Sequence, residues 1–70
     1  NAVSGGVVHT DALEHFPNKD EMLAMGEKTP AGRIVEPQDI ADAVAWLAGP
    51  ESTMIVGQTL IVDGGYSLPA

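Results

Sequence analysis

The clearest pattern in the chain is a helical stripe of apolar residues between positions 37 and 48. Apolar side chains recur there three, four and seven residues apart, which puts them on one face of a helix. Pro37 suits the first helical turn, and Gly49 followed by Pro50 is a typical stop signal. We therefore expect an amphipathic helix over residues 37–48. Its apolar face consists of Ile40, Ala41, Val44, Leu47 and Ala48.

Two segments near the ends of the chain have the character of β-strands. Residues 58–63 include an almost continuous apolar run at positions 60–62, which is typical of a parallel strand covered on both faces. Near the start, apolar residues flank Ser4, Gly5 and Gly6. This arrangement predicts the end of a strand followed by a bend, where paired glycines permit a positive φ or the close approach of a ligand.

Residues 11–28 are expected to form two short helices. Pro17 ends the first, because proline cannot continue a helix. Asn18 followed three residues later by Glu21 predicts a capping box at the start of the second, and Gly26 is expected to end it. The apolar positions of the two helices are Leu13, Phe16, Met22, Leu23 and Met25.

The order strand, helices, strand predicts an α/β fold. A helix that connects two parallel strands implies a right-handed crossover. Two strands alone leave faces and edges bare, so we interpret the chain as the last crossover and final strand of a larger doubly wound parallel sheet.

Composition narrows the function classes. The chain has 70 residues, a net charge of −7 and only three strong bases, so phosphate backbones and anionic membranes are unfavourable partners. With no cysteine and only two histidines, the chain has too few ligands of the usual kind for a closed zinc site, and we expect no metal. No apolar run approaches the ~20 residues that span a bilayer. We expect a soluble, cytoplasmic protein.

Three motifs resemble segments of the short-chain dehydrogenase/reductase family. Residues 1–11, NAVSGGVVHTD, are similar to the family's N-A-V-x-P-G-x-[IV]-x-T. Within residues 30–41, PAGR and EPQDIA resemble P-x-G-R-x-x-x-P-E-D-I-A, and within residues 55–65, IVGQ and VDGG resemble I-T-G-Q-x-x-x-V-D-G-G. Each motif is weak alone, but the three occur in order and cover nearly the whole chain.

The resemblance implies that residues 1–70 are a C-terminal fragment of a single Rossmann-like domain. Residues 1–10 are then a strand end and cofactor loop, 11–28 are helices that cover the substrate, 37–48 are the last helix and 58–63 the last strand. The Gly-rich phosphate loop and the catalytic tyrosine and lysine are expected upstream. The fragment would hold no catalytic residue and be inactive alone.

One departure from the family pattern points to a branch. Most members have proline where this chain has Gly5. The Ser-Gly-Gly variant, followed by TDAL and HFPN, resembles NADPH-dependent enoyl-acyl-carrier-protein reductases of fatty-acid synthesis. The resemblance implies NADPH (or NADH), an acyl-thioester or other small-molecule substrate, and a homo-oligomer, a tetramer in the full-length enzyme. Two alternatives are another short-chain dehydrogenase, such as a 3-oxoacyl reductase or a sugar or alcohol dehydrogenase, and a non-enzymatic dimerisation module.

The resemblance also assigns site residues. Gly5 and Gly6 are expected to let the backbone approach the nicotinamide, Val8 to offer its backbone groups to the carboxamide, and Thr10 to offer a hydroxyl to the carboxamide or a phosphate. The alternative is a plain turn in which Thr10 caps a helix.

Leu13, Phe16 and Met22 are expected to contact the substrate. An apolar, methionine-bearing cover suits a flexible acyl chain, because thioethers adapt to irregular shapes. Ordinary packing of these helices against a core explains the same residues equally well.

The remaining polar residues are expected to be structural. Residues 9–15 contain two histidines and two acids that we interpret as a solvated face. Arg33 is expected to pair with Glu36. Tyr66 lacks a lysine four residues later, where the family requires one, so it is not the catalytic tyrosine. The turn at residues 63–65 opens no helix, so it is interpreted as structural rather than as a phosphate cradle.

Overall fold

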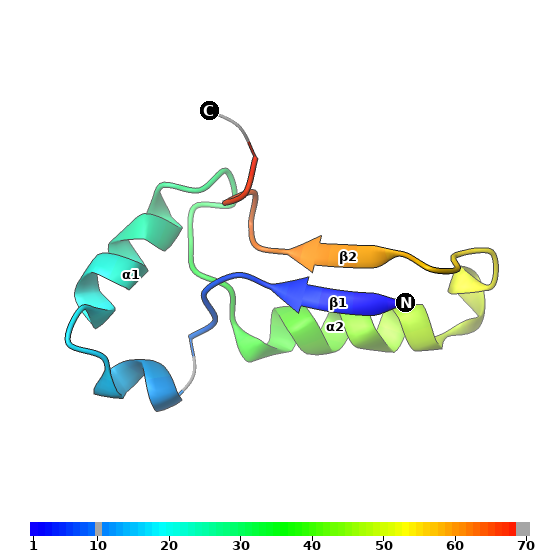
Figure 1. The fold of residues 1–70 in the computed structure, drawn as a ribbon, viewed down its shortest axis with the longest axis horizontal. Helices are drawn as coiled ribbons and strands as arrows, with labels where there is room; N and C mark the ends of the chain where they lie inside the picture. The colour runs from blue at the N-terminus through cyan, green and yellow to red at the C-terminus, as the bar shows by residue number, and fades with distance from the viewer. Residues whose placement is uncertain (10, 69–70) are drawn as a thin grey trace.

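The computed structural model describes residues 1–9 and 11–68, except for the side chains of Leu13 and Glu14. The chain forms two strands, two α-helices and two short 3₁₀ helices (Figure 1). The elements are β1 (Ala2–Gly5), η1 (Asp11–His15), α1 (Lys19–Glu27), α2 (Pro37–Ala48), η2 (Pro50–Ser52) and β2 (Thr59–Val62).

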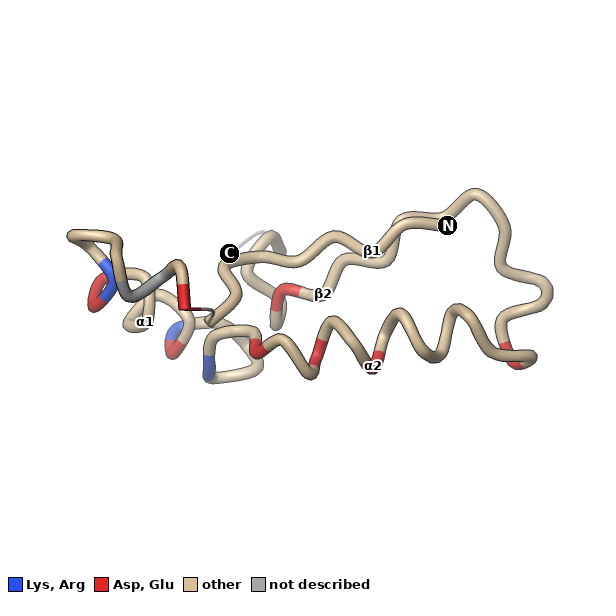
Figure 2. Tube along the Cα trace, turned by 90° about the horizontal axis from the view of Figure 1, so that it is seen from below, with Lys and Arg blue, Asp and Glu red and all other residues tan. Residues whose placement is uncertain are grey.

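The two strands pair in parallel, as predicted. The register runs from Ala2 opposite Thr59 to Gly5 opposite Val62. Helix α2 connects the strands and lies along one face of the pair (Figures 1 and 2). This arrangement confirms an α/β fold with a parallel crossover, consistent with part of a Rossmann-like sheet. Strand β2 is shorter than the predicted segment 58–63.

Helix α2 has the predicted bounds, but its N-terminus is held differently from expectation. The Asp39 carboxylate accepts a hydrogen bond from the Glu36 backbone N–H at 2.8 Å. The Arg33 guanidinium donates to both Asp39 carboxylate oxygens, at 2.7 and 2.9 Å. The predicted pair of Arg33 with Glu36 is therefore wrong. Asp39 reaches back over the first turn, so it meets Arg33 and the helix start together.

Helix α1 also differs from its prediction. Asn18 occupies the N-cap position but makes no side-chain capping bond, so the predicted capping box is wrong. Gly26 does not end the helix, which continues to Glu27. Gly26 is buried, and a Cβ placed on it would lie 2.7 Å from the Ile34 backbone nitrogen. Glycine is needed there because α1 packs directly on the backbone of the following segment.

The buried apolar core is small. Ile34 and Val35, which lie between the two α-helices in sequence, are 9% and 6% exposed. In the strands, Leu60 is 40% and Ile61 is 58% exposed. Helix α2 covers one face of the strand pair, and the opposite face is open in the part of the chain that the structure describes (Figure 2). The expectation of a strand covered on both faces is therefore not met here.

No helix in residues 1–9 and 11–68 combines the length and the apolar character needed to cross a membrane.

Replacing Gly26 by alanine is expected to destabilise the protein. The new Cβ would clash with the Ile34 backbone, and overpacking of this kind costs roughly 1–3 kcal/mol. That cost outweighs the gain of up to about 1 kcal/mol in helix propensity. Urea denaturation measures the difference. Gly49→Ala is the matched control, because its closest contact is the end of the flexible Glu51 side chain; equal midpoints for the two variants would contradict the packing account.

The contribution of Asp39 to stability is expected to fade in acid. The hydrogen bond from Arg33 and then that from the Glu36 backbone lower the pKa of Asp39 from 3.8 to about 2. A depressed carboxyl pKa stabilises the folded state above the unfolded pKa, and this stabilisation is lost as the pH falls through the folded value. The wild type should therefore have a higher free energy of unfolding than Asp39→Asn. This difference should be constant above about pH 4 and shrink between pH 4 and pH 2.

Denaturation midpoints at pH 6, 4 and 2.5 measure this advantage. Asp20→Asn, on the exposed surface of α1, controls for the loss of one negative charge. If the difference in denaturation midpoint between the wild type and Asp39→Asn stays the same across this pH range, the pairing of Asp39 with Arg33 is contradicted.

Candidate functional site

The bend after β1 and the turn after β2 lie side by side at the carboxyl ends of the two parallel strands (Figure 1). The Gly6 backbone N–H donates to the Val62 carbonyl at 3.3 Å. A Cβ on Gly6 would lie 3.0 Å from the Asp63 Cβ. In open α/β sheets, ligands bind beyond the carboxyl ends of the strands, so this edge is the candidate site.

Both glycines of the bend make close contacts with neighbouring elements. A Cβ on Gly5 would lie 3.0 Å from the Ile40 Cδ1 of α2. Packing within the chain is therefore one reason for glycine at both positions. The two residues are nevertheless exposed, so their backbone is open to a ligand on the side away from these contacts.

The segment after the bend is tied to the residues before α2. Val8 forms an isolated parallel bridge with Val35, and the His9 N–H donates to the Val35 carbonyl at 2.8 Å. The His9 Nδ1 lies 3.3 Å from the Glu36 Oε1. These contacts leave Val8 half-buried and hold the backbone that was predicted to meet the carboxamide.

The turn after β2 is a structural turn, as expected. The Asp63 carboxylate accepts hydrogen bonds from the backbone N–H groups of Gly65 and Ser67, each at 2.9 Å. A hydrogen bond from the Ser67 side chain, followed by the Gly65 and Ser67 backbone bonds, lowers the pKa of Asp63. Gly64 and Gly65 have φ values of 67° and 93°, a region that favours glycine. The N–H groups that a phosphate would need are thus engaged by Asp63.

The predicted substrate residues differ in burial. Met22 is half-buried and lines a small cavity together with Val7, the residue after the glycine bend. Phe16 is 49% exposed. Thr10 and the Leu13 side chain lie outside the described residues, so their predicted roles stay predictions.

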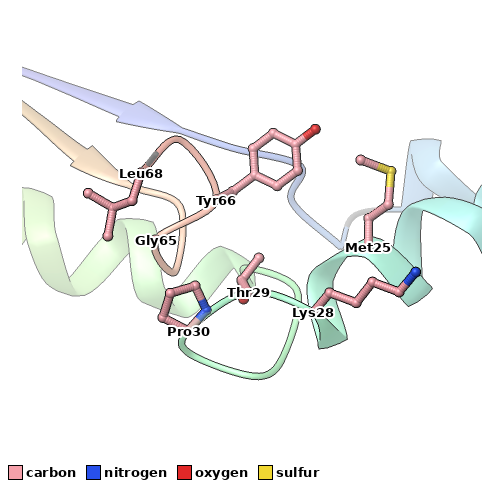
Figure 3. Close-up of a pocket in the computed structure, with 7 residues that line it drawn as sticks. All are labelled: Met25, Lys28, Thr29, Pro30, Gly65, Tyr66 and Leu68. Carbon is pink, nitrogen blue, oxygen red and sulfur yellow. The ribbon is translucent and has the colours of Figure 1, made fainter. Parts of the chain in front are cut away.

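Sequence reasoning missed a larger pocket beside this cavity. It has a volume of about 460 Å³ and lies between the end of α1 and the turn after β2 (Figure 3). The available signal was the pair of turn glycines followed by Tyr66 and Leu68, because a glycine turn redirects the chain and the large side chains that follow it. The pocket is lined by Met25, Lys28, Thr29, Pro30, Gly65, Tyr66 and Leu68.

The polar residues near the site form no metal centre in the part of the chain that the structure describes. No group of three His, Cys, Asp or Glu side chains there is placed to hold an ion. Arg33 is engaged by Asp39.

Comparison with known proteins gives a consistent family signal. Residues 1–67 match the family model described as "Enoyl-(Acyl carrier protein) reductase". The chain is 44% identical over 73 residues to 1-cyclohexenylcarbonyl-CoA reductase of Streptomyces collinus. The matched region covers 100% of the chain and 26% of that protein.

Two further relatives carry different names. The 3-oxoacyl-[acyl-carrier-protein] reductase of Vibrio harveyi is 43% identical over 93% of the chain and 26% of its own length. The NADP-dependent (R)-specific alcohol dehydrogenase of Lentilactobacillus kefiri is 39% identical over 96% of the chain and 27% of its own length. The chain thus spans about a quarter of the length of the curated relatives it matches.

Proposed function

The chain belongs to the short-chain dehydrogenase/reductase family, and from that premise we propose that it forms one edge of the nicotinamide site of an NAD(P)H-dependent oxidoreductase. The observation that carries this proposal is the exposed Gly5–Gly6 bend at the carboxyl end of β1, pressed against the turn that follows β2. The name of the Lentilactobacillus relative includes NADP dependence, which supports this choice of cofactor.

The residues at the bend suit the nicotinamide end of such a cofactor. A carboxamide is neutral and has both donor and acceptor groups, so backbone N–H and C=O groups can bind it without a basic side chain. Both oxygens of the Asp63 carboxylate already accept backbone N–H bonds from its own turn, so this neighbouring acid is engaged within the chain. When bound, the cofactor supplies the hydride chemistry, and the protein supplies orientation.

Each part of the chain has a distinct task in this proposal. The backbone of Gly5, Gly6 and Val8 binds and orients the carboxamide, and the Thr10 hydroxyl adds a further hydrogen bond. The bridge between Val8 and Val35 keeps that backbone in one conformation. Helix α1, through residues such as Met22, covers the substrate and excludes water.

Within the family, we propose reduction of the 2,3 double bond of an acyl thioester. The description of the matching family model and the Ser-Gly-Gly variant support this reaction. The catalytic tyrosine and lysine are proposed to lie in the rest of the enzyme, which acts as a cytoplasmic homotetramer. A ketone substrate is the second candidate, because the Vibrio relative is named a 3-oxoacyl reductase and the Lentilactobacillus relative an alcohol dehydrogenase.

A substrate comparison with the full-length enzyme separates the two reactions. NADPH oxidation is followed at 340 nm with a 2-enoyl thioester and with the 3-oxoacyl thioester of the same length. A ratio of the two kcat/KM values on the order of tenfold identifies the preferred substrate. The proposal predicts the higher kcat/KM for the enoyl thioester. Preference for the ketone would support the second candidate, and turnover of neither would contradict both.

Replacing Gly6 by valine is expected to weaken cofactor binding in the full-length enzyme. The branched side chain would meet Asp63 on one side and project into the space of the carboxamide on the other, so the backbone must move. Loss of one or two hydrogen bonds corresponds to roughly a 5- to 100-fold rise in Kd. Fluorescence titration with NADPH measures the change.

Ala2→Val is the matched control for this substitution. Ala2 is exposed at the start of β1, at the opposite end from the bend, and valine is favoured in strands. If Gly6→Val folds with an unchanged melting temperature and binds NADPH as the wild type does, the bend does not contact the cofactor.

A further inference from the structure

The side chain that follows Val8 reaches the start of α2. The His9 Nδ1 lies 3.3 Å from the Glu36 Oε1, although the two residues are 27 apart in the chain. Glu36 directly precedes α2. The His9 side chain is 38% exposed and the Glu36 side chain 48%. The pair therefore joins the segment after the glycine bend to the helix start at a place where solvent protons reach it.

The backbone of this segment turns the polar groups of Val8 away from the rest of the chain. The His9 N–H donates to the Val35 carbonyl at 2.8 Å, beside the bridge between Val8 and Val35. In a β-ladder, residues that bond to the partner strand alternate with residues whose N–H and C=O point the other way. The N–H and C=O of Val8 therefore point away from Val35, and their direction depends on how His9 is held.

Glu36 is a fixed point for this segment. Its backbone N–H donates to the Asp39 carboxylate in the first turn of α2 at 2.8 Å. Arg33 binds both oxygens of the same carboxylate. Because Glu36 is tied to the helix, breaking its contact with His9 frees the segment that carries Val8 rather than the start of α2.

The charged groups beside Glu36 keep their charge between pH 6 and pH 8. The hydrogen bond to Asp39 raises the pKa of Arg33, and the charges of Asp39 and of Glu36 add to this rise. The pKa of Asp39 is lowered to about 2, first by the hydrogen bond from Arg33. The 3₁₀ helix that follows His9 in the chain supplies the other titratable groups nearby. They are Asp11, Glu14, whose side chain lies outside the described ones, and His15.

We propose that His9 and Glu36 form a positioning pair for the cofactor, and that the enzyme binds NADPH more tightly when His9 is protonated. This inference rests on the proposed function, since the direction of the Val8 backbone matters only if that backbone meets the carboxamide. Neither residue touches the reacting atoms.

The chemistry of imidazole gives the direction of the effect. A protonated imidazole donates from Nδ1 and carries a charge opposite to that of Glu36, whereas a neutral imidazole has this proton in only one of its two tautomers. An ordinary histidine changes charge near pH ~6.5. The pair is thus strongest in mild acid and weakens as the pH rises.

The pH dependence of NADPH affinity in the full-length enzyme tests the proposal. Fluorescence titration gives the Kd of the wild type and of Glu36→Gln at pH 6 and at pH 8. The ratio of the two Kd values cancels the titration of the cofactor's own phosphate. Exposed ion pairs contribute a factor of up to about 5, so this ratio should be about 2–5 at pH 6 and approach 1 at pH 8. His9→Asn, whose amide replaces Nδ1 but gains no proton, should give the same pattern.

Asp42→Asn is the matched control for Glu36→Gln. It removes the same charge from the first turns of α2, together with an exposed side-chain hydrogen bond from Gln38 of 2.6 Å. His15→Asn controls for the second histidine. For each control, the ratio of its Kd to that of the wild type should be the same at both pH values.

A role in stability alone would lower the melting temperature of Glu36→Gln and leave its Kd ratio equal at pH 6 and pH 8. That result, or an equally pH-dependent ratio for Asp42→Asn, would overturn this inference while leaving the cofactor assignment intact. A wild-type enzyme that binds no NADPH would overturn the proposed function and this inference together.

Discussion

The parallel pairing of β1 with β2 is the constraint on which the rest of the molecule depends. Its register sets Gly5 opposite Val62, so the two strands end at the same level. The bend and the turn that follow must then meet, and they do so at 3.0 Å between a Cβ on Gly6 and the Asp63 Cβ. A slip by one residue would turn every strand side chain to the other face and would separate the bend from the turn.

The contacts around this pairing hold the candidate site from two sides. On one side, Val8 and His9 join the segment at Val35 and Glu36, and Asp39 and Arg33 fix the start of α2 immediately afterwards. On the other side, the turn after β2 packs on the loop before Arg33, where a Cβ on Gly65 would lie 2.7 Å from the Pro30 side chain. The loop at residues 29–36 thus links the Gly5–Gly6 bend to the pocket beside Tyr66.

The sequence predicts an element of this fold correctly where residues close in sequence determine it, and fails where tertiary packing does. Helix α2 was predicted to the residue, because an apolar stripe, Pro37 and the Gly49-Pro50 stop all act locally. The partner of Arg33 was predicted wrongly, because Glu36 is nearer in sequence but Asp39 is the residue that folds back over the helix start. Gly26 was misread as a helix end, since its contact with Ile34 appears only when α1 packs on the next segment.

The same distinction applies to the candidate site, part of which was predicted from the sequence and part of which was missed. The Ser-Gly-Gly bend was found because paired glycines mark a bend, although neither Gly5 nor Gly6 has a positive φ and both are explained by close contacts instead. The pocket at Tyr66 and Leu68 depends on the direction in which the Gly64-Gly65 turn sends the chain. A crystal structure of the full-length enzyme with NADPH would test the proposed contact between the Val8 backbone and the nicotinamide carboxamide. We expect a hydrogen bond of about 3 Å between these two groups. A nicotinamide bound away from the carboxyl ends of β1 and β2 would overturn the proposal.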